Sequence, residues 1–148
     1  MSLFMESTKI SPEQTVTEIQ RCLGRYGARS ILVEYEDGEV DAVSFQVAVK
    51  GTLVPFHLPC RWKAVYSALY EGKKGRNTEK GYAIRDAQAK RVAWRQILRW
   101  VEAQMALVQT KMVSMEEVFL PYMQVKPGQT LYQVLENRGF KMLEAPKE

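Results

Sequence analysis

The spacing of apolar residues near the start of the chain predicts a helix. Val16, Ile19 and Leu23 recur at i, i+3 and i+7, which places them on one face of an α-helix. The preceding Ser11-Pro12-Glu13-Gln14 supplies an N-cap, a proline in the first turn and the glutamine of a capping box. We therefore expect a helix from Pro12 to Leu23, ended by a nearby glycine.

From residue 30 the apolar residues alternate with polar ones, and this period of two predicts strands. In the first run Ile31, Val33 and Tyr35 alternate with Leu32, Glu34 and Glu36, and we interpret this as a strand with one buried face. Similar runs follow over 43–49 and 54–58, and Asp-Gly and Lys-Gly turns separate the three runs. Pro55 cannot donate to a strand ladder, so the third strand is expected at a sheet edge. The pattern predicts an antiparallel three-stranded meander.

Helical spacing returns at Arg61–Tyr70, and a loop rich in glycine and bases, 72–81, precedes a long helix predicted from Tyr82 to Met112. This helix has two apolar faces, one formed by Ala87, Trp94, Ile97, Leu98, Val101, Met105, Val108 and Met112 and the other by Ala89, Ala93, Trp100 and Leu107. We expect it to be sandwiched between the sheet and either C-terminal elements or another subunit. Short helices are predicted from Ser114 and from Thr130, followed by an extended segment at 140–143.

These elements predict an α+β fold with an N-terminal helix, a three-stranded antiparallel meander, a long basic helix and short C-terminal helices. A chain of 148 residues that is 46% apolar and 26% charged fits one globular domain. We assign 1–10 to a flexible arm, 11–144 to the domain and 145–148 to a tail. The chain has no apolar run long enough to span a membrane, and its start lacks the basic segment of a signal peptide. We therefore expect a cytoplasmic protein without membrane contact.

The charges are unevenly distributed along the chain. The segment from Arg61 to Arg99 contains eleven Lys/Arg and three Asp/Glu, a local charge of about +8, whereas the net charge of the whole chain is +4. A concentrated positive charge is typical of proteins that bind polyanions.

The predicted long helix carries part of this charge in one sector, because Arg91, Arg95 and Arg99 recur at i, i+4 and i+8 and would project along one side. Arginine suits both phosphate contacts and stacking on bases. Tyr70 and Tyr82 are candidate stacking residues next to the basic loop, supported by Tyr66 and Trp62. The predicted nucleic-acid-binding residues are Lys73, Lys74, Arg76, Lys80, Arg85, Arg91, Arg95 and Arg99.

Most catalytic chemistries lack their residues in this sequence. One histidine, His57, and two distant cysteines, Cys22 and Cys60, are too few for a zinc site, so no metal or other cofactor is expected. The cysteines are interpreted as reduced, partly buried thiols. There is no G-x-S-x-G and no phosphate-binding loop, and the acids around Asp37 are interpreted as a solvated hairpin tip. We predict no catalytic residues and a non-enzymatic role.

The order of a helix, a three-stranded meander and a long basic helix over residues 12–112 is similar to two nucleic-acid-binding folds. One is the double-stranded-RNA-binding domain, and the other is the core of single-strand annealing recombinases. The sequence from Val118 to Met123, following an Arg/Trp-rich helix, also looks like that of small uncharacterised proteins of prophages and mobile elements. These resemblances imply a recombination or accessory factor that contacts DNA or RNA.

Two functions remain open from the sequence. The first is binding of single-stranded DNA or structured RNA through phosphate contacts, because Arg and Lys on a helix mostly contact the backbone. The second is a protein–protein interaction module, an accessory subunit that binds a host or self partner. In that case Trp100 and the C-terminal helices would form the surface for a homo-oligomer or another protein.

Overall fold

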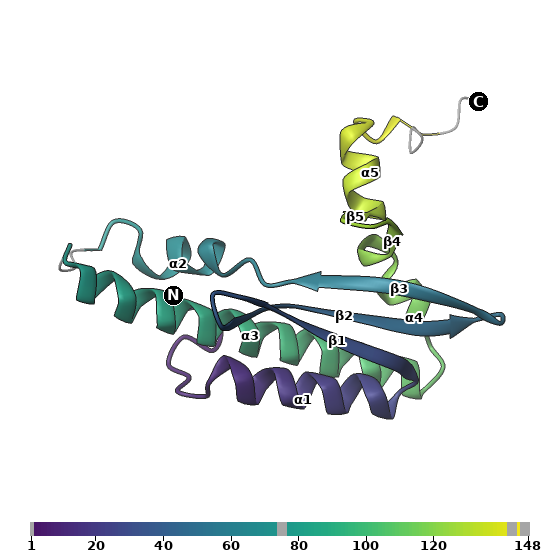
Figure 1. Cartoon of the computed structure of the whole chain (residues 1–148), viewed down its shortest axis with the longest axis horizontal. Helices are drawn as coiled ribbons and strands as arrows, with labels where there is room; N and C mark the ends of the chain where they lie inside the picture. Colours follow the sequence, from purple (N-terminus) through teal and green to yellow (C-terminus); the bar gives the residue numbers. More distant parts are fainter. Residues whose placement is uncertain (1, 74–76, 142–144, 146–148) are drawn as a thin grey trace.

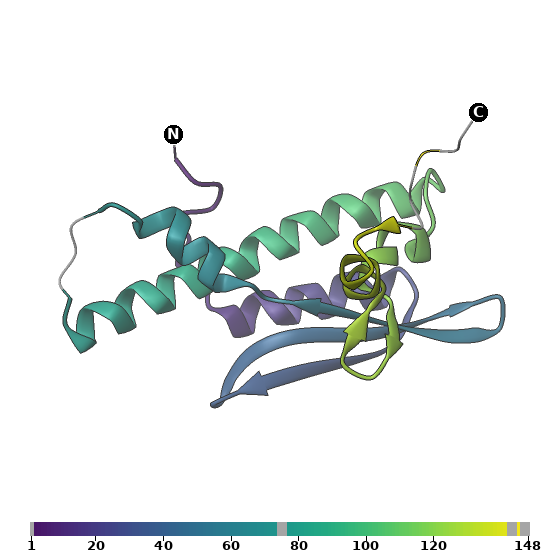
Figure 2. The ribbon, with the colours of Figure 1, turned by 90° about the horizontal axis from the view of Figure 1, so that it is seen from above.

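The computed structural model describes residues 2–73, 77–141 and 145, and it has the predicted α+β architecture (Figure 1). Helices α1 and α3 lie along one face of a three-stranded sheet, and the C-terminal elements begin beside α3 and end on the other side of the sheet (Figures 1 and 2). In chain order the elements are α1 (Pro12–Arg25), β1 (Ala28–Glu36), β2 (Glu39–Val49), β3 (Thr52–Pro59), α2 (Trp62–Tyr70), α3 (Glu79–Gln109), α4 (Met115–Val118), the 3-10 turn η1 (Leu120–Tyr122), β4 (Gln124–Lys126), β5 (Gln129–Thr130) and α5 (Leu131–Asn137).

The sheet confirms the predicted meander. Its order is β1-β2-β3 with antiparallel pairing throughout, and Phe45 at its centre is the partner of both Ile31 and Phe56. Pro55 lies on an edge strand, as its missing N–H requires. Tyr35 differs from the simple alternation because it is 64% exposed. The register of β1 shifts between Glu34 and Tyr35, so the alternation of faces is interrupted there.

The core lies between the sheet and the two helices. The rings of Phe45, Phe56 and Phe119 are in contact, with centroids 5.1 to 6.2 Å apart, and Trp94 of α3 is fully buried beside them. The second face of α3 packs on α2, where Leu69 clusters with Ala89 and Val92. The long helix is therefore covered on two sides, but the prediction named C-terminal elements or another subunit as the second layer and missed α2.

The boundaries of α3 differ from the prediction by about one turn. Thr78 caps the helix, and its Oγ1 accepts a hydrogen bond from the backbone N–H of Gly81 at 3.1 Å, so the helix begins at Glu79 instead of Tyr82. The helix stops at Gln109 because Lys111 has a φ of 62°, which a continuing α-helix does not permit.

The C-terminal segment covers Trp100, which the sequence analysis proposed as a contact residue for a partner protein. Trp100 makes edge contacts with Phe119 and Tyr122 of the same chain, at 5.4 and 5.6 Å between ring centroids.

The strands β4 and β5 were not predicted, because two or three residues are too short for an alternating pattern. In the predicted extended segment, Phe140 and Lys141 lie in a turn, and the other two residues lie outside the described part of the chain.

The N-terminal segment was predicted to be a flexible arm. Its backbone carbonyls accept hydrogen bonds from side chains of α3. The side-chain amide of Gln88 donates to the carbonyls of Glu6 and Thr8 at 2.8 and 3.0 Å, and that of Gln96 donates to the carbonyl of Phe4 at 2.9 Å.

Within the described residues, no helix combines the length and apolar character needed to cross a bilayer.

Candidate nucleic-acid interface

The basic and aromatic residues predicted around the 72–81 loop meet at the open end of the α2–α3 pair. These two helices run in opposite directions and pack side by side beyond the end of the sheet (Figures 1 and 2). Between them lies a groove of about 570 Å³, which we call the tyrosine groove. Its lining includes Tyr66, Tyr70, Lys73, Asn77, Tyr82 and Arg85.

Three tyrosines supply the flat surfaces of this groove. Tyr66 and Tyr70 are one helical turn apart on α2, and their rings pack edge to face with centroids 5.1 Å apart. Tyr82 comes from the first turn of α3, where the Thr78 cap positions it, and its hydroxyl donates to Asn77 Oδ1 at 3.3 Å. Tyr82 is 46% exposed, so an external group can reach it.

Arg85 connects the two helices across the groove. Its guanidinium stacks on the ring of Tyr82 at 4.8 Å, and its Nε donates to the hydroxyl of Tyr66 at 3.0 Å. The hydrogen bond to Tyr66 raises the pKa of Arg85, which therefore stays a cation at any physiological pH. Burial and the neighbouring Tyr66 raise the pKa of Tyr70, so its phenol remains neutral. The groove thus combines a fixed cation with neutral aromatic surfaces.

Two further predicted residues lie near the groove. Lys73 lines it directly, and Lys80 is exposed in the first turn of α3. Glu71 also lines the groove and reduces the positive charge there. Lys74 and Arg76, which were predicted to bind nucleic acid, lie outside the described residues.

The predicted arginine stripe along α3 does not form, and Arg95 is the reason. Its side chain is only 3% exposed, because α1 packs over this sector of α3. Its Nη1 forms an ion pair with Glu18 and donates to Thr15 Oγ1 at 3.3 Å. The prediction that Arg95 contacts nucleic acid is therefore wrong, and it serves instead as a buried cation between two helices.

The remaining cations of the stripe are engaged with their own neighbours. Arg91 donates from Nε to Gln88 Oε1 at 2.9 Å, and Arg99 pairs with Glu102 at 2.6 Å within the helix. Arg99 is exposed but lies more than three helical turns from Arg85 along the helix. Of the predicted binding residues, Lys73 and Arg85 therefore meet in one groove, whereas Arg91, Arg95 and Arg99 lie away from it.

Comparison with known protein families, curated proteins and solved structures found no match to this chain. The resemblances to RNA-binding domains, annealing proteins and mobile-element proteins accordingly stay predictions from the sequence.

Sequence reasoning missed a second polar cluster on the outer face of the sheet. Glu34, Ser44 and His57 come from three different strands, and hydrogen bonds of 3.0 and 2.9 Å join Ser44 to the other two residues. Glu34 is therefore part of a polar network within the sheet, in contrast to the solvated hairpin tip to which we assigned the acids of this region. The strand register could have indicated this cluster, because Ser44 and His57 are direct partners in the pairing of β2 with β3.

The two cysteines are free and at least partly buried, as predicted. Burial, with the nearby Asp41 carboxylate, raises the pKa of the Cys60 thiol to about 12. The pKa of Cys22 is also raised, mainly by burial. Because the thiolate is the reactive form, neither side chain is suited to act as a nucleophile at neutral pH.

Proposed function

We propose that this chain binds single-stranded nucleic acid at the tyrosine groove, without covalent chemistry. Bases stack on the exposed faces of Tyr82 and Tyr70, while Lys73, Lys80 and Arg85 contact the phosphates. The observation that carries the proposal is the meeting of these tyrosines with Arg85 in one groove. Proteins that bind single strands combine aromatic platforms with a positively charged path in this way.

The charge distribution supports a polyanion as the ligand. Lys73 and Arg85 line the groove and Lys80 lies in the first turn of α3, so three cations accompany one lining acid, Glu71. The aromatic surfaces favour nucleic acid over an acidic protein, because every base has a π-face and stacking on it tolerates any sequence. We therefore expect weak sequence preference. A role in recombination or as an accessory factor of a mobile element remains a proposal from the sequence.

The second candidate, a protein–protein module, has less support because its main aromatic contact residue is covered by the chain itself. Trp100 was the aromatic residue available to a partner on α3, and it packs against Phe119 and Tyr122 of its own chain. The exposed apolar side chains of the described residues are spread over several elements, such as Leu32 on β1, Ile84 on α3 and Met112 after α3. Isolated exposed apolar residues are common on protein surfaces.

The proposal is tested by fluorescence anisotropy of short labelled oligothymidylate and oligouridylate, with a duplex of the same length for comparison. We expect the single strands to bind more tightly than the duplex. With about three phosphates neutralised, the log–log slope of the association constant against salt should be about −2. No binding of either single strand at low salt, or an affinity that salt does not change, would contradict the proposal.

A further inference from the structure

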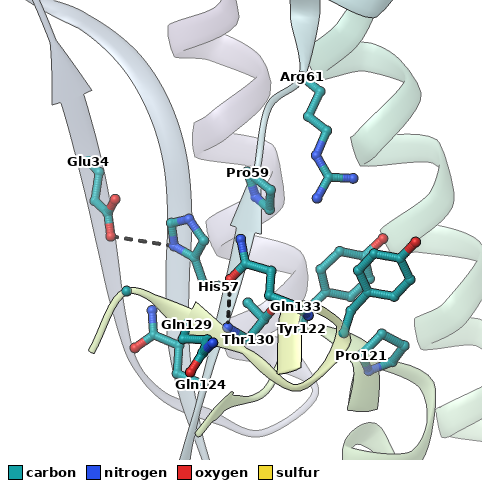
Figure 3. Close-up of a pocket in the computed structure, with 12 residues that line it drawn as sticks. Glu34, His57, Pro59, Arg61, Pro121, Tyr122, Gln124, Gln129, Thr130 and Gln133 are labelled. Carbon is teal, nitrogen blue, oxygen red and sulfur yellow. Dashed lines mark hydrogen bonds and ion pairs between the residues drawn. The ribbon is translucent and has the colours of Figure 1, made fainter. Parts of the chain in front are cut away.

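A pocket on the outer face of the sheet is separate from the tyrosine groove. It has a volume of about 480 Å³ and lies between β3 on one side and the β4–β5 hairpin with the start of α5 on the other (Figure 3). The groove lies at the opposite end of α2 from this pocket (Figure 1). A volume of this size is in the range of pockets that hold small molecules.

One wall of the pocket includes Glu34 and His57, which Ser44 of β2 joins through hydrogen bonds. The Ser44 hydroxyl donates to Glu34 Oε1 at 3.0 Å, so its oxygen is left to accept from His57 Nδ1 at 2.9 Å. This order places the proton of a neutral imidazole on Nδ1 and leaves Nε2 as an acceptor. Among the described residues Nε2 has no hydrogen-bond partner.

The same geometry argues against a hydrolase. In a Ser-His-acid triad the hydroxyl and the carboxylate use different ring nitrogens, so that the base can take a proton from the serine. Here both Ser44 and Glu34 approach Nδ1 of His57, at 2.9 and 3.6 Å. The chain therefore fixes the orientation of the His57 ring and does not activate Ser44.

The other walls combine a cation, amides and a flat ring. Arg61, which precedes α2, directs its guanidinium toward the pocket, and the ring of Tyr122 lies below it (Figure 3). Gln133 uses its Oε1 to accept from the N–H of Thr130 at 2.8 Å, which leaves its NH₂ group as a donor. Gln124 and Gln129 add two more side-chain amides to the lining.

We propose that this pocket binds a nucleoside monophosphate. Arg61 holds the phosphate, because a guanidinium matches two phosphate oxygens at once. The base lies against Tyr122, and the glutamine amides with His57 Nε2 contact its edge, as glutamine does with the donor and acceptor pair of adenine. The inference is independent of the proposed function, since no residue of the tyrosine groove takes part.

Calorimetric titration of the full chain with AMP tests this inference, with inorganic phosphate and adenosine as the two halves of the ligand. We expect AMP to bind at least about tenfold more tightly than either half. Arg61→Gln should weaken AMP binding by about tenfold or more while phosphate binding disappears. Arg61 is exposed and makes no side-chain cap bond to α2, so this variant should keep its circular dichroism and its unfolding midpoint.

The matched control is Arg99→Gln, which removes the same charge at an exposed position outside the pocket and should leave the affinity for AMP unchanged. The same titration of Tyr82→Ala shows whether AMP binds at the tyrosine groove instead. The 5′ end of a phosphorylated strand offers the same chemistry, and a 5′-phosphorylated oligoadenylate that binds more tightly than AMP, with the same loss in Arg61→Gln, would identify that source. Four results would overturn the inference: no heat with AMP at millimolar concentration, phosphate alone binding as tightly as AMP, binding unaffected by Arg61→Gln, or binding lost in Tyr82→Ala.

Discussion

Replacing Tyr82 by alanine is expected to weaken the binding of single-stranded oligonucleotides by about tenfold or more, because base–aromatic stacking contributes about 1–3 kcal/mol per base. Its side chain is 46% exposed, so the variant should stay folded. The salt dependence should not change, since the lost contact carries no charge. Anisotropy titrations at several salt concentrations measure both quantities.

Arg85→Gln is the complementary change in the same groove. It should weaken binding and also reduce the magnitude of the log–log salt slope by about 0.7, the value for one phosphate contact on a single strand. Arg99→Gln is the matched control, because it removes the same charge from the same helix at an exposed position away from the groove. Equal losses in Arg85→Gln and Arg99→Gln would contradict a localised site and indicate a diffuse attraction to the whole helix.

Glu18→Gln is expected to lower the free energy of unfolding by about 2 kcal/mol, because it leaves the buried charge of Arg95 without its partner. The loss is smaller than for a fully buried pair because the Glu18 side chain is 39% exposed. Arg95 is 3% exposed, and its Nε already has no hydrogen-bond partner within the described part of the chain. Glutamine keeps the size and shape of the side chain, so the change isolates the charge. Urea unfolding followed by circular dichroism measures the loss.

The chain offers a control for this prediction in the exposed pair of Arg99 and Glu102. Both side chains are more than 40% exposed, and pairs of this kind contribute about 0–1 kcal/mol. Glu102→Gln should therefore shift the urea midpoint little. A loss in Glu18→Gln no larger than that in Glu102→Gln would show that the Arg95 charge is solvated in spite of its burial. Arg95→Met removes the buried charge itself, so no unpaired cation is left in the interior. We expect it to lower the free energy of unfolding by less than Glu18→Gln does.

The sequence predicted the architecture well because each element has a strong local signal. The alternation around Phe45 and Phe56 identified the sheet, and Pro55 identified its edge. The capping residues also located most helix starts. The exception was Thr78, which starts α3 earlier than the apolar spacing suggests.

The candidate site was predicted less completely, for a physical reason. Helical spacing shows that Arg91, Arg95 and Arg99 share a sector, but it does not show which sector another helix will cover. In the fold α1 covers the position of Arg95, and Glu18 supplies the opposite charge there. The tyrosines were identified because they flank the basic loop in the sequence itself.

Local patterns in the sequence could not predict the pocket around His57. Its lining residues come from β1, β3 and the C-terminal elements, so they meet only through the sheet and the packing of β4 against β3. The hydrogen bond between Ser44 and His57 follows from their pairing in the sheet, which a list of residue types does not contain.

The central claim is that bases stack on the tyrosine groove, and ultraviolet crosslinking tests it most directly. An oligonucleotide carrying 5-bromodeoxyuridine or 4-thiouridine is irradiated with the full chain, and the crosslinked peptides are identified by mass spectrometry. The account predicts crosslinks at Tyr82 and Tyr70, on the helices that flank the groove. Crosslinks confined to peptides outside residues 62–85, in a complex shown to form by anisotropy, would contradict it.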